Sequence, residues 1–207
     1  MHFTADQQFW WNWWVQLGVA IGTIGAVCVA LWAVLRRQKP SLKLRVLDPQ
    51  GESTNLVSGE QARYYHLQIC NEERSSAIAT QVQVFLTRIE ESDWSTGIQR
   101  RTWKGNVPMR WRDQEFVPRF QSVGSTKDCD LLMVGRQSGL RLLPLYEPTS
   151  HTWLYPNRCK LVMFLQARSD QVDSQLIVVE VSWDGEWADG SEEMVGHLKV
   201  GEQVKPR

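Results

Sequence analysis

The sequence predicts a mainly β protein: an N-terminal single transmembrane α-helix followed by an antiparallel β-sandwich, immunoglobulin-like or jelly-roll-like. Two observations carry this prediction. The first is an unbroken apolar run without a charged side chain, and the second is a long series of short segments that alternate apolar and polar residues between turn formers. The expected parts are a short extracytoplasmic N-terminus (1–14), a transmembrane helix (15–35), a basic linker (36–41) and a sandwich domain (42–207).

The apolar run has the length and the flanks of a membrane anchor. Its 21 residues reach about 32 Å as an α-helix, and a bilayer's hydrocarbon core is roughly 30 Å thick. Tryptophans precede the run and basic residues follow it, and both types favour the membrane–water interface. These expected interface residues, which make membrane lipid the first predicted partner, are Trp10, Trp11, Trp13, Trp14, Arg36, Arg37 and Lys39.

Charge asymmetry predicts the orientation of this anchor. No Lys or Arg precedes the run, whereas five basic residues follow it by residue 45. Because Lys and Arg stay on the cytoplasmic side, we expect the N-terminus outside and the domain in the cytoplasm. The alternative is a cleaved signal peptide, which is less favoured because the N-terminal segment has no basic side chain and the apolar core is too long.

Small residues recur along one face of the predicted helix. They are spaced by four, at Gly18, Gly22, Ala26 and Ala30. Such spacing lets two helix backbones approach closely in lipid, so it predicts a homo-oligomer formed through the membrane helix. The alternative is a pattern that arises from composition, because Gly and Ala are common in membrane helices.

Short alternating runs predict the strands of the sandwich. The pattern is clearest in Leu42–Val46 and Tyr65–Ile69. Further predicted strands cover residues 82–89, 130–134, 140–145, 161–167, 176–183 and 197–200. Turn formers such as Asp184-Gly185 separate these runs.

This arrangement is typical of an antiparallel sandwich or barrel, of which we favour the sandwich. We expect Trp111 and Val178 to face its core. Apart from the N-terminal helix, only residues 73–80 offer a short helical segment.

Residues 97–120 form a loop-rich stretch in which basic and aromatic residues are interleaved. One interpretation is a surface for anionic groups, and its candidates are Arg100, Arg101, Lys104, Arg110 and Arg112. The other is a strand at 109–112, with Met109 and Trp111 inward and the arginines in water. The alternation favours the strand.

Motifs for chemistry are missing from the sequence. The four histidines lack zinc-ligand spacing, and no serine lies in a nucleophile motif. The acidic segment 184–193 departs from EF-hand spacing, and its Asp-Gly pairs indicate turns first, so cation binding there stays an open alternative. The scattered cysteines at 70, 129 and 159 indicate reduced thiols. We therefore expect no enzyme activity, no cofactor and no metal.

Charge balance bears on the class of partner. The chain has 23 basic and 23 acidic residues, which argues against a nucleic-acid partner. The function expected is a membrane-anchored, non-catalytic binding, sensing or adaptor module, whose partner is a cytosolic protein or small ligand. The alternative is a membrane-acting effector that clusters through its small-residue helix face when it receives a signal. An enzyme without a recognisable motif is the third hypothesis.

Overall fold

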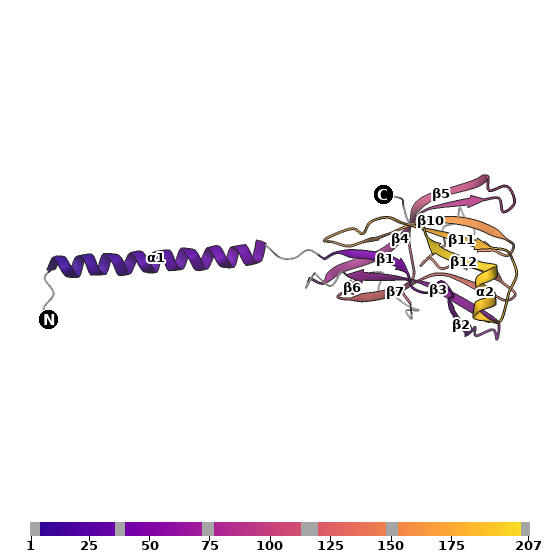
Figure 1. Ribbon diagram of the computed structural model, residues 1–207, viewed down its shortest axis with the longest axis horizontal. Helices are drawn as coiled ribbons and strands as arrows, with labels where there is room; N and C mark the ends of the chain where they lie inside the picture. The colour runs from indigo at the N-terminus through magenta and orange to yellow at the C-terminus, as the bar shows by residue number, and fades with distance from the viewer. Residues whose placement is uncertain (1–4, 36–39, 72–76, 113–119, 148–152, 204–207) are drawn as a thin grey trace. The chain divides into compact units, whose positions relative to one another are not determined.

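Helix and strands lie in two separate units of the chain. The computed structural model describes residues 5–35, 40–71, 77–112, 120–147 and 153–203. One unit spans residues 1–38 and the other spans residues 39–207 (Figure 1). The first unit is a single helix and the second is built from two antiparallel sheets packed together. The predicted fold class, a helix followed by a β-sandwich, is confirmed.

Helix α1 runs from Ala5 to Leu35. It begins ten residues before the apolar run, so the tryptophans belong to the helix. The ring of Trp13 meets those of Trp10 and Trp14 edge to face. Within it, the segment Gln8–Ala33 is long and apolar enough to cross a membrane. Its length and composition are those of a membrane-spanning helix.

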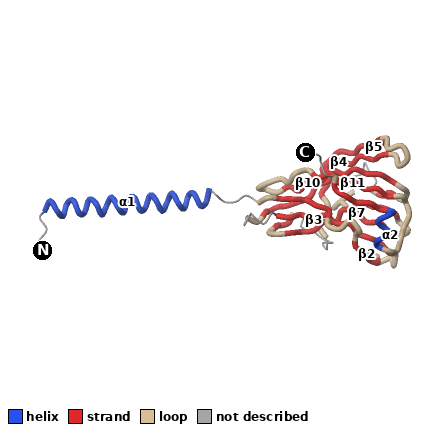
Figure 2. Tube along the Cα trace, viewed as in Figure 1, coloured by secondary structure: helices blue, strands red, loops and turns tan. Residues whose placement is uncertain are grey.

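The described strands form two six-stranded antiparallel sheets (Figures 1 and 2). In the first sheet the order is β1-β3-β7-β8-β9, and β2 also pairs with β3. Its strands are β1 (Leu42–Val46), β2 (Glu52–Asn55), β3 (Gln61–Asn71), β7 (Thr126–Gly135), β8 (Gly139–Leu142) and β9 (Leu154–Tyr155).

In the second sheet the order is β12-β11-β10-β4-β5, and β6 also pairs with β4. Its strands are β4 (Ala79–Ser92), β5 (Gln99–Pro108), β6 (Gln121–Val123), β10 (Cys159–Arg168), β11 (Ile177–Trp183) and β12 (Leu198–Glu202). A short helix, α2 (Ser191–His197), precedes β12.

Alternation along the strands builds the core between the sheets. In β10 every second residue, from Cys159 to Ala167, is buried, and the residues between them are partly exposed. Met109 and Trp111 are also buried, as their alternation predicts. Successive strand residues point to opposite faces. One face of each sheet therefore packs inward, and the other face carries polar side chains.

Several local expectations were wrong. Val178 is half-buried and its neighbour Val179 is completely buried, because two valines in succession fit the period-2 pattern in either phase. The strand expected at 140–145 ends at Leu142. His197 closes helix α2 instead of opening a strand.

Two longer segments also differ from expectation. The loop-rich stretch 97–120 contains the ten-residue strand β5. The short helix expected at 73–80 is not formed where the structure describes it, because Ala79 already begins β4; residues 73–76 lie outside the described residues. A helix does form near the C-terminus. It was not predicted because it has seven residues and only Met194 among them is buried, so no apolar residues recur at helical spacing.

Candidate functional site

A polar pocket lies against the outer face of the first sheet. Its volume is about 360 Å³. Strands β2, β3 and β7 contribute to it, together with the turn after β2 and residue 112. We call it the His66 pocket; its lining residues are Glu52, Thr54, Asn55, Leu56, Val57, Tyr64, His66, Arg112 and Asp130.

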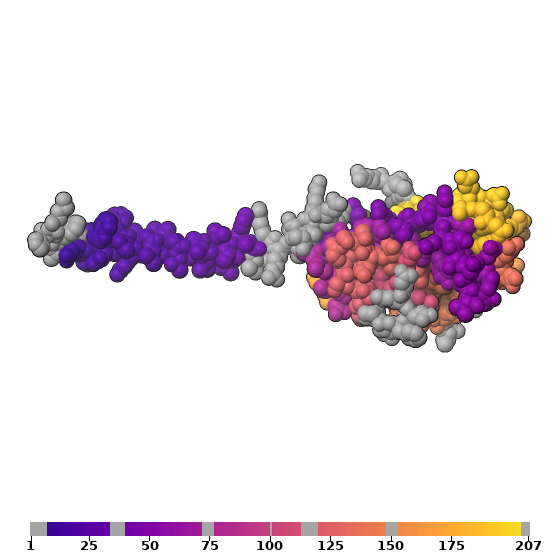
Figure 3. Space-filling model, turned by 90° about the horizontal axis from the view of Figure 1, so that it is seen from below, coloured from indigo at the N-terminus to yellow at the C-terminus, as the bar shows by residue number. Residues whose placement is uncertain are grey.

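Strand phase brings the polar residues to this face. Tyr65 and Leu67 of β3 are fully buried in the core, so Tyr64 and His66 point outward. His66 pairs in register with Asp130 of β7, at a point where the register between the two strands shifts by one residue. Segments from β2–β3 and from β7 lie side by side on the face shown in Figure 3, in purple and salmon.

His66 is held between two carboxylates. Its Nδ1 is 3.1 Å from Oδ1 of Asp130, and its Nε2 is 3.7 Å from Oε2 of Glu52. His66 is only 7% exposed and Asp130 only 8%. The Tyr64 ring is nearly parallel to the imidazole, at 12° with 6.3 Å between centroids. Contacts on both nitrogens and on the ring face therefore fix the orientation of His66.

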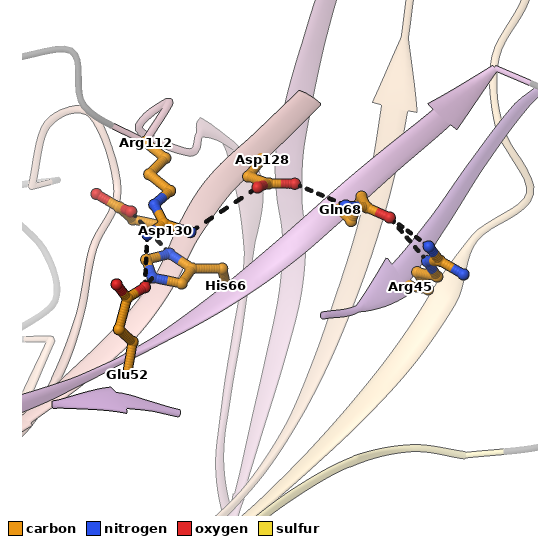
Figure 4. A network of polar contacts seen from close by, with 7 residues as sticks. All are labelled: Arg45, Glu52, His66, Gln68, Arg112, Asp128 and Asp130. Carbon is orange, nitrogen blue, oxygen red and sulfur yellow. Dashed lines mark hydrogen bonds and ion pairs between the residues drawn. The ribbon is translucent and has the colours of Figure 1, made fainter. Parts of the chain in front are cut away.

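Arg112 joins the two strands that flank this histidine. Its guanidinium forms an ion pair with Glu52 of β2, and its Nη1 lies 3.9 Å from Oδ2 of Asp128 in β7 (Figure 4). Its backbone N–H donates to the carbonyl oxygen of Asp128 at 3.1 Å, so β7 also places its backbone. A planar guanidinium with several donors suits this bridging position better than a lysine would.

The polar contacts continue from the pocket across the sheet. The Gln68 amide donates to Oδ1 of Asp128 at 3.1 Å, and Nε of Arg45 donates to Oε1 of Gln68 at 3.0 Å (Figure 4). Arg45 belongs to β1, the first strand after the linker that follows helix α1. A chain of side-chain contacts thus runs from the pocket to the edge strand that begins the domain.

Charge and burial decide which groups this pocket offers. Glu52, Asp130 and the nearby Asp128 provide carboxylate acceptors, and Arg112 provides guanidinium donors. Burial raises the pKa of the Tyr64 hydroxyl, and the Asp130 carboxylate adds to this rise. Tyr64 consequently stays protonated near neutral pH. The pocket offers both donors and acceptors, which fits a ligand with both kinds of polar group.

The geometry at His66 differs from that of nucleophilic catalysis. In such sites the second imidazole nitrogen faces a hydroxyl or thiol that it deprotonates. Here Nε2 faces the Glu52 carboxylate instead, and the hydroxyl groups in the described lining are those of Thr54 and Tyr64. Nor does the described part of the chain hold a group of three or more His, Cys, Asp or Glu side chains placed to bind a metal ion.

The structure separates the five basic candidates of residues 97–120. Arg112 lines the His66 pocket, and Arg110 is exposed on the same short segment. Lys104, however, lines a different pocket on the second sheet. Arg101 is exposed on β5, and the side chain of Arg100 lies outside the described part. Of the candidates whose side chains the structure describes, Arg112 and Lys104 thus line different pockets, and binding of anionic groups by this set stays a prediction.

The membrane-interface and helix-packing candidates lie on α1 and beside it. Trp10, Trp11, Trp13 and Trp14 are exposed. Along the small-residue face, Gly18 and Gly22 have open space around them, and Ala26 and Ala30 are exposed. The basic residues Arg36, Arg37 and Lys39 lie outside the described residues.

The acidic segment 184–193 makes contacts within the domain. Asp184 lies 2.8 Å from Nδ1 of His197, and Asp189 accepts a hydrogen bond from the Trp187 indole at 2.9 Å. Asp189 also pairs with Arg136 at 3.3 Å. Asp184 thus pairs with the last residue of α2, and Asp189 links the segment before α2 to Arg136.

Sequence reasoning missed the histidine, the carboxylates and the tyrosine of the pocket. The spacing of the four histidines gives no reason to single out His66. A signal for the site does exist, since Asp128 and Asp130 in one strand and His66 and Gln68 in another occupy alternate positions opposite apolar residues. No protein-family model matches the chain, and no curated protein or solved structure shows significant similarity to it.

Proposed function

We propose that this protein is a single-pass membrane protein whose cytoplasmic β-sandwich is a non-catalytic binding or sensing module, with the His66 pocket as its ligand site. One observation carries the proposal. Glu52 and Asp130, the carboxylates that flank His66, lie on strands β2 and β7, and a backbone hydrogen bond to β7 places Arg112 beside them in the lining of the pocket. Side chains fixed on strands form a more precisely arranged site than side chains on loops.

The cost of this arrangement supports a binding role. Burying His66 and Asp130 is unfavourable unless the groups are paired, and an apolar pair of similar size gives comparable stability. Arg112 is only partly exposed, pairs with Glu52 and lines the pocket. A small polar ligand with an acceptor for Arg112 and a donor for Asp130 or Glu52 satisfies both kinds of group.

The helix gives this module its location. Segment Gln8–Ala33 meets the length and composition requirements of a membrane span, and the basic residues after it favour a cytoplasmic domain. Anchoring raises the effective concentration of the module for partners at the same membrane.

The test is ligand retention by the full-length protein. We would purify the chain from membranes in a mild detergent and identify bound small molecules by native mass spectrometry. Arg112→Gln and Asp130→Asn should each lose the bound species, because each removes one charged contact. Arg136→Gln is the matched control, since Arg136 forms an ion pair with Asp189 outside the pocket and should retain the ligand.

Two results would contradict the proposal. Equal retention by the wild type and the two pocket variants places the ligand elsewhere. A wild-type protein that carries no bound small molecule, from cells or after incubation with a cell extract, removes the support for a small-ligand module.

A further inference from the structure

A second pocket lies on the outer face of the second sheet. Its volume is about 580 Å³, and it is formed by β4, β5, β10 and the residue before β11. We call it the Arg88 pocket; its lining side chains are Thr87, Arg88, Lys104, Asn106, Phe164 and Leu176. The described lining contains two cations and no carboxylate, in contrast to the His66 pocket.

The pocket lies where strand pairing is irregular on both sides of β4. Between Leu86 and Arg88, one residue of β4, Thr87, faces two residues of β5. The register between β4 and β10 shifts at the same point, and the Thr87 hydroxyl donates to the carbonyl oxygen of Phe164 at 3.0 Å. Bulges of this kind redirect side chains and are common beside functional sites. The pocket therefore lies over β4 and its two neighbouring strands, at the point where the pairing of β4 is irregular.

The Arg88 guanidinium is held in place before any ligand arrives. Its Cζ lies 3.6 Å from the centroid of the Phe164 ring, and its Nε lies 3.3 Å from Oε1 of Glu90. Within the described residues, no hydrogen bond or ion pair is recorded for its two terminal nitrogens. A stacked guanidinium keeps its N–H donors at its edge, where they match two oxygens of a phosphate group.

Lys104 supplies the second cation. It pairs in register with Arg88 across β4 and β5, and its side chain is exposed. For this ammonium group, too, no ion pair is recorded in the part of the chain that the structure describes. Two neighbouring cations without a carboxylate in the lining repel a cationic ligand and attract an anionic one.

We propose that the Arg88 pocket binds the phosphate group of a small organic phosphate monoester. Arg88 and Lys104 contact the phosphate oxygens, and the Asn106 amide donates a further hydrogen bond. The organic part of the ligand lies against Phe164 and Leu176, the latter 49% exposed. A soluble nucleotide and a phosphatidic acid headgroup share this chemistry, and the experiment below distinguishes them.

Glu90 gives the proposal a distinctive consequence. Its carboxylate contacts Nε of Arg88 but is not part of the pocket lining. It therefore partly neutralises the cation that the ligand needs. Glu90→Gln removes this charge and should strengthen phosphate binding, whereas a merely structural role of Arg88 predicts no gain.

The experiment is isothermal titration calorimetry on the full-length protein in a nonionic detergent. The probes are adenosine monophosphate and monomeric dihexanoyl phosphatidic acid, with adenosine as the uncharged control. We expect at least one phosphate probe to bind and adenosine not to bind. Arg88→Gln should weaken binding at least about tenfold, since one charge-assisted contact to phosphate is lost. Glu90→Gln should bind more tightly than the wild type.

Arg141→Gln is the matched control, because Arg141 is an exposed arginine paired with a carboxylate, Glu147, on the other sheet. It should bind like the wild type. Binding of adenosine monophosphate alone assigns the pocket to a soluble ligand, and binding of phosphatidic acid alone assigns it to a lipid headgroup. The proposal is overturned if neither phosphate binds at millimolar concentration, or if Arg88→Gln and Arg141→Gln lose affinity equally.

Discussion

Val178 and Val179 are neighbours on β11 that face opposite sides of the second sheet. Val179 is completely buried, whereas Val178 is only half-buried and pairs in register with Phe164 on the outer face. Val179→Ala should lower the free energy of unfolding by about 1–3 kcal/mol, because it leaves a cavity in the packed core. Val178→Ala should cost less than about 1 kcal/mol. Urea denaturation of a fragment that begins at residue 39 measures both, and the reverse order would contradict this orientation of β11.

Differences in burial also predict differences in reactivity among the cysteines of the domain. Burial raises the pKa of the Cys159 thiol to about 12 and that of Cys129 well above its usual value. Because the thiolate is the reactive form, a raised pKa leaves little of it at pH 8. Iodoacetamide should therefore label Cys70, which is half-buried, before Cys129 and Cys159. Mass spectrometry of the native fragment checks the order, and unfolding in urea should make all three equally reactive.

For single residues, the sequence predicts burial better than it predicts which side chains meet in the pocket. The inward positions of Met109 and Trp111 follow from alternation alone. The partnership of His66 with Asp130 and Glu52 depends on the pairing of β3 with its neighbour β2 and with β7, a strand far away in the chain, where the register shifts beside His66. A period-2 pattern shows which face a residue occupies but not which residue lies opposite.

The two pockets share a property of their strands. The His66 pocket lies next to the shift between β3 and β7, and the Arg88 pocket lies at the double irregularity of β4. Both sites thus occur where local pairing departs from the regular ladder, as expected if irregular pairing is retained for function. Such departures carry no composition signal. Alternation indicates the polar face on which the His66 pocket lies, but the register shifts that accompany the two pockets could not be read from the sequence.

Elements with strong alternation were predictable and the others were not. The bounds of β1 match the expected Leu42–Val46. Strand β5 was missed because its residues are mostly polar or basic; Val107 near its end is the buried core residue, and Trp103 packs against the core while partly exposed. Strand β2 was missed because all four of its residues are exposed, so alternation has no core-facing member there.

The small-residue face of helix α1 is predicted to pack against the same face of a second copy. If it does, Gly22→Ile places a branched side chain where two backbones approach closely, and self-association should fall strongly. Leu31→Ile lies off this face and should change little. A membrane two-hybrid assay on residues 1–40 gives the measurement.

Equal signals from the wild type and Gly22→Ile would attribute the spacing to composition and would favour the passive binding module. A selective loss would show oligomerisation, which the effector alternative requires. That alternative would then need a second measurement, a change of membrane permeability on clustering.

For the molecule as a whole, the class of fold followed from the sequence and the connectivity did not. One apolar segment and many alternating runs require a helix and a two-layer β structure, because each apolar face must be covered. The order of strands depends on contacts between distant segments, such as the pairing of β4 with β10. The two sheets also meet at their edges, where the Val46 amide of β1 donates to the Glu202 carboxylate of β12.

The orientation of the chain across a membrane is the property on which the proposed function depends most. All basic side chains near the helix follow it, so a reporter fused after Arg207 should be cytoplasmic: a fluorescent protein should be bright and alkaline phosphatase inactive. Replacing Arg36, Arg37 and Lys39 by neutral residues, with two lysines added near Asp6, should give mixed or inverted insertion, because the same charges determine both outcomes. An active phosphatase fusion on the unaltered chain would place the sandwich outside the cytoplasm. The ligand of the His66 pocket would then have to be sought among extracytoplasmic molecules.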